Sequence, residues 1–169
     1  MFLEGFQGVE RRVHHELVGQ PRRHAAAWFG VHLVGDFGEV VALGYQCPGA
    51  FDLGNPHLVL LVERPEDIDL GAAGALHEAA YDGGMNVHFV APMADVPDSM
   101  AMRVWERGAG ITEACGTGAT AVARAAHDWG LVGEQVTVSM PGGSVQVLVG
   151  DPMILRGPSV FIAGIVVPQ

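Results

Sequence analysis

Short apolar runs, many of them alternating with polar residues, recur along most of this chain. Such runs are typical of β-strands when turn-forming residues separate them. We predict strands over residues 28–34, 39–45, 57–62, 86–91, 100–107, 135–140, 144–149 and 159–167. A tight turn at Pro141-Gly142-Gly143 separates two of them. The chain is therefore expected to be rich in β-structure.

Two segments instead predict helices, residues 65–80 and residues 116–129. The first has Pro65 in its first turn and ends before Asp82-Gly83-Gly84. The second stops at Gly130, which we expect in the left-handed conformation of a helix C-cap. Apolar residues cover most of the second helix's circumference, which predicts burial on all sides. They are Ala119, Ala121, Val122, Ala123, Ala125 and Ala126.

The predicted fold class is therefore α/β (α+β): a strongly bent, mixed β-sheet or barrel wrapped around a central apolar helix. We assign residues 28–169 to one such lobe. Residues 1–27 are polar and weakly patterned, with arginines and histidines close together. We interpret them as a linker, a frayed terminus or the remnant of another unit.

Composition narrows the classes of function. The 169 residues carry a formal net charge of -10, with 49% apolar and 17% charged residues. This balance excludes intrinsic disorder and disfavours nucleic acid or an anionic membrane as a partner. Every cationic side chain is an arginine. Without lysine, a pyridoxal-phosphate Schiff base and a P-loop are excluded, because both require its amine.

Cysteine content and hydropathy bear on location. The chain has two cysteines, too few for a disulfide framework or a four-thiolate zinc site. We expect no metal and no cofactor. No apolar run approaches the ~20 residues that a membrane helix needs, and the first residues do not resemble a signal peptide. We therefore expect a cytoplasmic protein whose thiols are reduced.

The densest candidate chemistry lies just before the second predicted helix. A strand ends in Glu106 and Arg107, a glycine-rich loop follows, and Cys115 precedes the helix. Gly116 and Gly118 allow close approach of a ligand and leave amide hydrogens for a carboxylate. Because a helix N-terminus stabilises an anion, we expect the pKa of Cys115 to lie below that of a free thiol. The alternative is a buried, inert cysteine beside a tight turn.

A second cluster, Gly54-Asn55-Pro56-His57, precedes another predicted strand. Pro56 fixes the backbone after Asn55, whose side chain offers both a donor and an acceptor. Asn86 begins a further strand in the same way. Taken alone, these residues favour ordinary turns, and a single histidine such as His57 favours a structural role.

Four motifs in one register nevertheless resemble a known family. They are Gly54-Asn55-Pro56-His57, Gly84-Met85-Asn86-Val87, Arg103-Val104-Trp105-Glu106-Arg107-Gly108 and Ala114-Cys115-Gly116-Thr117-Gly118-Ala119. With the later motifs Pro141-Gly142-Gly143 and Arg156-Gly157-Pro158, they resemble diaminopimelate epimerase over about residues 50–165. Each motif alone is weak, whereas their shared order and spacing are specific.

This resemblance implies inversion at an α-carbon without pyridoxal phosphate, between LL- and meso-diaminopimelate in lysine and peptidoglycan biosynthesis. The family has two lobes, each a barrel-like sheet around a central helix, with the substrate between them. Each lobe contributes one cysteine. One thiolate removes the α-proton while a thiol on the opposite face donates another, which inverts the centre.

The resemblance also implies roles for individual residues. Cys115 would be one of the two acid/base residues. The backbones of Gly116 and Thr117 would bind the α-carboxylate of the substrate. The substrate's other amino and carboxylate groups would be held by Asn55, Asn86, Glu106 and Arg107. His57 and Glu106 would also tune the electrostatics of the site.

Two departures from the family pattern change the expectation. The family's first lobe carries its own Cys-Gly-Asn-Gly motif, which this sequence lacks, and Cys47-Pro48-Gly49 is not equivalent. The chain thus resembles the C-terminal lobe, inactive without a first lobe that carries the second catalytic cysteine. We expect the surface facing that lobe to favour a homo-oligomer. Ile111 replaces a glutamate usual in the family, with a small expected effect on the loop.

Two other functions stay open. The chain could be a binding or regulatory module of the same fold that has lost catalysis. It could also be an enzyme with Cys115 as nucleophile and His57 or His88 as base. An amino-acid clamp of Asn86 and Glu106-Arg107 favours the epimerase lobe or the binding module, because a hydrolase needs no such clamp.

Overall fold

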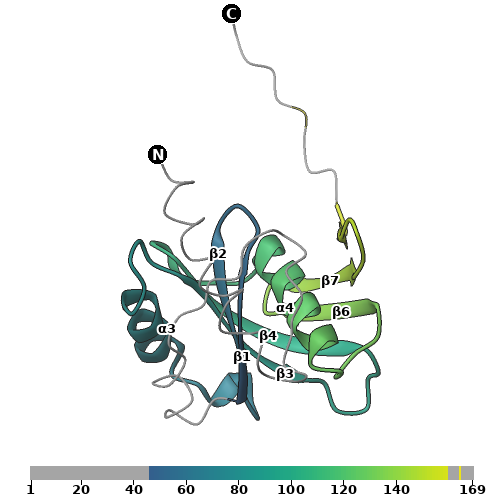
Figure 1. The fold of residues 1–169 in the computed structure, drawn as a ribbon, viewed down its shortest axis with the longest axis horizontal. Helices are drawn as coiled ribbons and strands as arrows, with labels where there is room; N and C mark the ends of the chain where they lie inside the picture. Colours follow the sequence, from purple (N-terminus) through teal and green to yellow (C-terminus); the bar gives the residue numbers. More distant parts are fainter. Residues whose placement is uncertain (1–45, 160–163, 165–169) are drawn as a thin grey trace, which may run out of the picture.

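The computed structural model describes residues 46–159 and residue 164 (Figure 1). In this part of the chain, eight strands form one mixed sheet of order β1-β2-β3-β4-β6-β7-β8, with β5 paired to β4. The strands are β1 (Gln46–Asp52), β2 (Pro56–Leu61), β3 (Asn86–Pro92), β4 (Ser99–Glu106), β5 (Gly110–Thr112), β6 (Gln135–Met140), β7 (Gly143–Leu148) and β8 (Ile154–Arg156). The helical elements of the same part are the 3₁₀ turn η2 (Pro65–Asp67) and the α-helices α3 (Leu70–Ala79) and α4 (Gly116–Asp128).

Several predictions fall outside the described residues. These are the polar segment 1–27, the strands over 28–34 and 39–45, and nearly all of the strand over 159–167. The other five predicted strands are confirmed with bounds within one residue.

Alternation along the central strands gives the sheet two apolar faces, because successive side chains of a strand point to opposite sides. On β3, Val87 and Phe89 join a cluster with Leu70 of α3. Val90, from the opposite face, joins a larger cluster with α4. Figure 1 shows the sheet curling around α4, with α3 set apart from it. The two helices therefore stabilise opposite faces.

The central helix α4 is made of small residues, and this lets the sheet close around it. Its buried positions are Gly118, Ala119, Thr120, Ala121, Val122, Ala123, Ala125 and Ala126. The helix packs against β2, β3, β4, β6 and β7. Gly130 follows it with a φ of 74°, as a left-handed C-cap requires. The bent mixed sheet around a buried central helix is thus confirmed.

The prediction of one helix over residues 65–80 is wrong in its first part. Ile68 is extended and separates η2 from α3. The side chain of Asp69 accepts a hydrogen bond of 3.2 Å from the backbone N–H of Ala72. Asp69 is therefore the N-cap from which a new helix starts.

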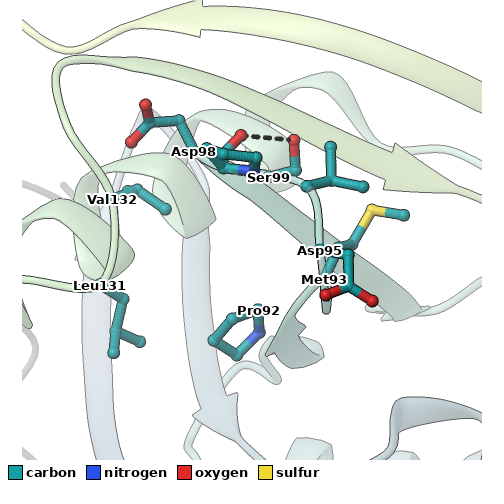
Figure 2. Close-up of a pocket in the computed structure, with 9 residues that line it drawn as sticks. Pro92, Met93, Asp95, Asp98, Ser99, Leu131 and Val132 are labelled. Atoms are coloured by element: carbon teal, nitrogen blue, oxygen red, sulfur yellow. Dashed lines mark hydrogen bonds between the residues drawn. The ribbon is translucent and has the colours of Figure 1, made fainter.

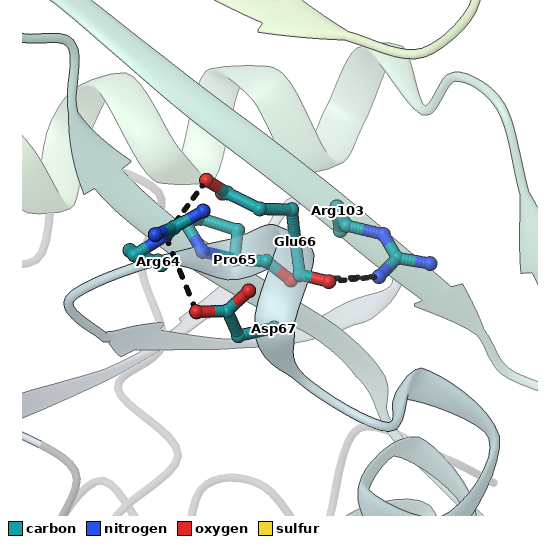
Figure 3. Close-up of polar contacts among 5 residues, drawn as sticks. All are labelled: Arg64, Pro65, Glu66, Asp67 and Arg103. Carbon is teal, nitrogen blue, oxygen red and sulfur yellow. Dashed lines mark hydrogen bonds and ion pairs between the residues drawn. The ribbon is translucent and has the colours of Figure 1, made fainter.

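The backbone carbonyls around η2 are bound by a neighbouring strand instead of by further helical turns. Arg103 of β4 donates through Nη1 to the carbonyl oxygens of Pro65 and Glu66, both at 3.5 Å, and of Ile68 at 3.3 Å. Arg64 forms an ion pair of 3.1 Å with Glu66. Figure 3 shows these side chains gathered around the turn. These contacts stabilise η2 as a turn separate from α3.

Three strands are not anticipated by the pattern. β1 contains Pro48 and Gly49, which indicate a loop, and its register shifts between Gln46 and Gly49 where it pairs with β2. Such residues are tolerated there because β1 is an edge strand of the described sheet. β5 and β8 have three residues each, too few for a periodic signal. Neither α3 nor α4 reaches the length and apolarity required of a membrane-spanning helix.

Close packing of α3 on β4 predicts a stability effect at Gly74. A Cβ at this position would lie 2.6 Å from Cβ of Trp105. Gly74→Ala should therefore lower the free energy of unfolding by about 1–3 kcal/mol, because the core would be overpacked. Urea unfolding followed by circular dichroism measures this.

Gly71→Ala, in the same helix, is the matched control. Its added Cβ would meet only Asp69 Oδ1, at 3.6 Å. We expect no loss of stability and a gain of up to about 1 kcal/mol. Equal effects of the two substitutions would contradict the described packing.

Candidate functional site

Cys115 lies at the N-cap of α4 in an extended conformation (φ -145°, ψ 110°). Its backbone N–H donates to Sδ of Met140 at 3.4 Å, and its Sγ lies 3.7 Å from Oγ1 of Thr117. Cys115 is only 7% exposed, whereas Gly116 and Thr117 are exposed. The first N–H groups of a helix lack intrahelical partners. The helix thus presents open backbone donors beside a sheltered thiol.

The surroundings of Cys115 raise the pKa of its thiol, so the expected lowering is wrong. Burial is the largest cause, because it disfavours the charged thiolate. Hydrogen bonds from the Gly118 backbone and the Thr117 side chain lower the pKa, and the nearby Glu106 carboxyl group raises it again. The helix N-terminus is therefore outweighed, and the neutral thiol is the favoured form of Cys115 at pH 7.

Glu106 is held beside Cys115 by the hairpin of β4 and β5. Thr112 of β5 donates through Oγ1 to Oε1 of Glu106 at 2.6 Å. Gly108 in the connecting turn and Gly110 at the start of β5 adopt φ values of 75° and 81°, a region that favours glycine. The short strand β5, which the sequence pattern does not reveal, therefore fixes a residue of the candidate site.

Asn86 joins two motifs that are far apart in sequence. Its Nδ2 donates to the carbonyl oxygen of Pro56 at 2.8 Å, and its Oδ1 accepts from the backbone N–H of Arg107 at 3.0 Å. In the parallel pairing of β2 and β3, Asn86 lies opposite His57. The side chain of Asn86 is therefore a clamp between the start of β2 and the end of β4, and the plain turn considered above does not describe it.

The start of β2, Asn86 and the turn after β4 form one corner of the lobe. Glu78 of α3 belongs to this corner, although sequence reasoning misses it. Its carboxyl oxygens accept from Trp105 Nε1 at 2.6 Å and from the Gly108 backbone N–H at 3.0 Å. Arg107 donates through Nη1 to the carbonyl oxygen of Gly83 at 3.0 Å. The turn that carries Arg107 is thus hydrogen-bonded both to Glu78 of α3 and to the backbone at Gly83. An acidic residue on a helix gives no sequence signal for such a contact.

His57 and His88 form a buried pair, and neither has measurable exposure. Nδ1 of His57 lies 2.8 Å from Nε2 of His88, and Nε2 of His57 lies 3.0 Å from Oδ1 of Asn55. Burial, and then the nearby Arg107 guanidinium, lower the pKa of His57 to about 4. Burial, and then His57, lower the pKa of His88 well below its usual value. Both rings are therefore neutral at pH 7.

The histidines do not serve Cys115 as a base would. Within the described part of the chain, the hydrogen-bonding partners of the thiol are Thr117, its own helix and Glu106, and not His57 or His88. A cysteine nucleophile needs its base within hydrogen-bonding reach. This geometry disfavours the hydrolase-like alternative.

A pocket of about 350 Å³ lies at the other end of α4, away from Cys115 (Figure 2). It is lined by residues 92–93 and 95–99, between β3 and β4, and by Leu131 and Val132 after α4. None of the predicted site residues lines it. The thiol of Cys115 lies instead beside Glu106, at the N-terminal end of the helix.

Comparison with known proteins agrees with the motifs. Residues 49–158 match the family model for diaminopimelate epimerase. The diaminopimelate epimerase of Mycobacteroides abscessus is 43% identical over 136 residues, which are 75% of this chain and 46% of that protein. That of Erythrobacter litoralis is 38% identical, covering 68% of this chain and 43% of that protein. That of Parabacteroides distasonis is 36% identical, covering 96% and 58%. The chain spans about half the length of these relatives.

The position of Glu106 predicts how the reactivity of Cys115 can be changed. Glu106→Gln removes a charge that raises the pKa of the thiol but keeps an oxygen that can accept from Thr112. The pKa of Cys115 should fall, and each unit gives about tenfold more thiolate below the pKa. Alkylation by iodoacetamide at pH 7–8 (about 0.5 to 1.5 units below a free thiol's pKa) should therefore become severalfold faster.

A Cys47→Ser background makes Cys115 the sole thiol, since the chain has two cysteines. Glu113→Gln is the matched control. Glu113 lies in the loop between β5 and Cys115, is exposed and does not contribute to the pKa of Cys115. Faster alkylation in both variants, or in neither, would contradict the described environment of the thiol.

Proposed function

This chain belongs to the diaminopimelate epimerase family, and on that premise we propose that it is the C-terminal lobe of an epimerase that interconverts LL- and meso-diaminopimelate. The proposal rests above all on one observation: Cys115 stands at the N-cap of the buried helix α4, beside Glu106. The reaction belongs to lysine and peptidoglycan biosynthesis. It uses no pyridoxal phosphate, which accords with the absence of lysine from the sequence.

In the proposed reaction, Cys115 is a proton donor in its resting state. The raised pKa of this buried thiol favours the protonated form. A thiolate of the first lobe removes the α-proton of the substrate, and the Cys115 S–H delivers a proton to the opposite face of the same carbon. Cys115 then holds the negative charge, and the reverse reaction exchanges the two roles. Acid/base groups placed in this way contribute about 10²–10⁴-fold each.

The α-carboxylate of the substrate would bind at the mouth of α4. The exposed backbones of Gly116 and Thr117 lie in the first turn of the helix. Their N–H groups and the helix dipole favour an anion there. The same donors would stabilise negative charge that spreads onto the carboxylate when the α-proton leaves.

The remaining substrate groups would be held by the corner that Asn86 clamps. Asn55, Glu106 and Arg107 border this corner and supply an amide, a carboxyl group and a guanidinium. Asn86 uses one hydrogen of Nδ2 and one lone pair of Oδ1 within the protein, which leaves one of each for the substrate. His57 is neutral, so it would act by positioning its neighbours and not by its charge.

The first lobe would cover apolar side chains around the helix mouth. Leu155 of β8 is 44% exposed and lies against Gly116, and Ile111 of β5 is 57% exposed. Contiguous exposed apolar surface marks interaction sites, and these two side chains would contribute to such a surface. We propose that a first lobe occupies this face in the active enzyme and that copies of this chain associate through it otherwise.

The proposal predicts activity only when a first lobe is supplied. The chain would be incubated in D₂O with LL-diaminopimelate, alone and with the N-terminal half of the Mycobacteroides abscessus relative. Deuterium at the α-carbon and meso product, followed by NMR and chiral chromatography, should appear only in the mixture. Cys115→Ser should lower both rates by about 10²–10⁴-fold, because the hydroxyl is a far weaker acid.

Cys47→Ser is the control and should leave the mixture active. Conversion by the chain alone at the rate of the mixture would sink the half-site proposal, and so would full activity of Cys115→Ser. Binding of diaminopimelate by the mixture, measured by calorimetry, without any deuterium exchange would favour the binding-module alternative.

A further inference from the structure

Three side chains form a buried hydrogen-bonded row from β3 to the edge of the candidate site. The row runs from His88 through His57 to Asn55, with the distances of 2.8 Å and 3.0 Å given above. We propose that His88 is a positioning residue, which through His57 fixes the Asn55 side-chain amide with its Nδ2 hydrogens available to the substrate. The identity of the substrate rests on the proposed function, whereas the fixed row does not.

The direction of every hydrogen bond in this row follows from its end at Asn55. Oδ1 of Asn55 only accepts, so Nε2 of His57 must carry the proton. A neutral His57 then has a lone pair on Nδ1, which accepts from the Nε2–H of His88. His88 is left with a lone pair on Nδ1, and this atom has no partner among the described residues.

The opposite direction is less favourable. If Asn55 were turned so that its Nδ2 donated to His57, His57 would carry its proton on Nδ1 and donate it to His88. The proton of His88 would then lie on its Nδ1, a buried N–H for which residues 46–159 offer no acceptor. Orphaned buried N–H groups are rarer in proteins than acceptors with an unused lone pair. His88 therefore selects one orientation of the Asn55 side-chain amide, although His57 lies between the two.

The ring of His88 is held in place from the other side by α4. A Cβ at Gly118 would lie 2.9 Å from Nε2 and 3.0 Å from Nδ1 of His88, so only a glycine leaves room for the ring. The rings of His57 and His88 are also stacked, with centroids 5.0 Å apart and an angle of 29° between planes. The position of His88 is thus set by the helix that carries Cys115.

The consequence for recognition lies at Asn55. One lone pair of its Oδ1 accepts from His57, whereas both hydrogens of Nδ2 are left for a bound ligand. A group that accepts hydrogen bonds, such as a carboxylate, therefore fits this end of the site better than an ammonium group. The row therefore adds chemical selectivity to Asn55, which lies in the short connection between β1 and β2.

Histidine tautomers report the row directly, without any ligand or second lobe. The full chain would be labelled with ¹⁵N-histidine, and long-range ¹H–¹⁵N spectra at pH 7 would distinguish Nδ1–H from Nε2–H for each ring. We expect His57 and His88 to be single Nε2–H tautomers. His127 donates through Nδ1 to the carbonyl oxygen of Gly133, so it provides the opposite pattern as an internal reference for folding.

Two substitutions then separate positioning from packing. His88→Met keeps bulk but removes the donor, and it should convert His57 to a mixture of tautomers and shift the Asn55 side-chain amide signals. His88→Gln supplies a new N–H donor and should restore the single tautomer. If the His127 pattern shows that His88→Met is unfolded, Gly118→Ala serves instead, because its Cβ displaces the ring while keeping every donor.

The outcomes decide the proposal independently of catalysis. A wild-type His57 protonated on Nδ1 would overturn it, and so would an unchanged single tautomer in folded His88→Met. Failure of the epimerase assay would leave these spectra unaffected. Conversely, a wrong tautomer would leave the proposed reaction at Cys115 intact.

Discussion

The burial of α4 against the curved sheet is the constraint on which the rest of the lobe depends. The sheet can approach the helix closely because the buried positions of α4 are occupied by glycine, alanine and other small residues. At Gly118 the contact is so close that a single added carbon would collide with His88. This packing fixes where the helix begins, and Cys115 is placed by it at the mouth of the site.

Closeness to the core also determines the chemistry of the thiol. A helix N-terminus favours a thiolate, but Cys115 is sheltered and has Glu106 beside it, and these effects together raise its pKa. A thiol of this kind suits the donation of a proton. It fits the proton donor of the two-thiol inversion that we propose.

The sequence predicts the bent sheet, the buried helix and the position of Cys115, because each depends on local pattern or on a motif. It does not predict β5 or β8, which are too short to show periodicity, or the break at Ile68, which depends on the Asp69 cap. The direction of the pKa change at Cys115 is also missed, since it depends on burial by distant residues. The pairing of His57 with His88 arises only when β2 and β3 lie in parallel register.

We propose that this chain by itself folds into a preformed half-site, held by the Asn86 clamp. The backbone N–H of Arg107 tests it most directly, because it lies beyond the end of β4 and donates to the Asn86 side chain. Its hydrogen–deuterium exchange, measured by NMR on the chain alone, should be as slow as that of amides within β4 and should become fast in Asn86→Ala. Exchange of the Arg107 amide at the rate of an exposed loop in the wild-type chain would contradict the account.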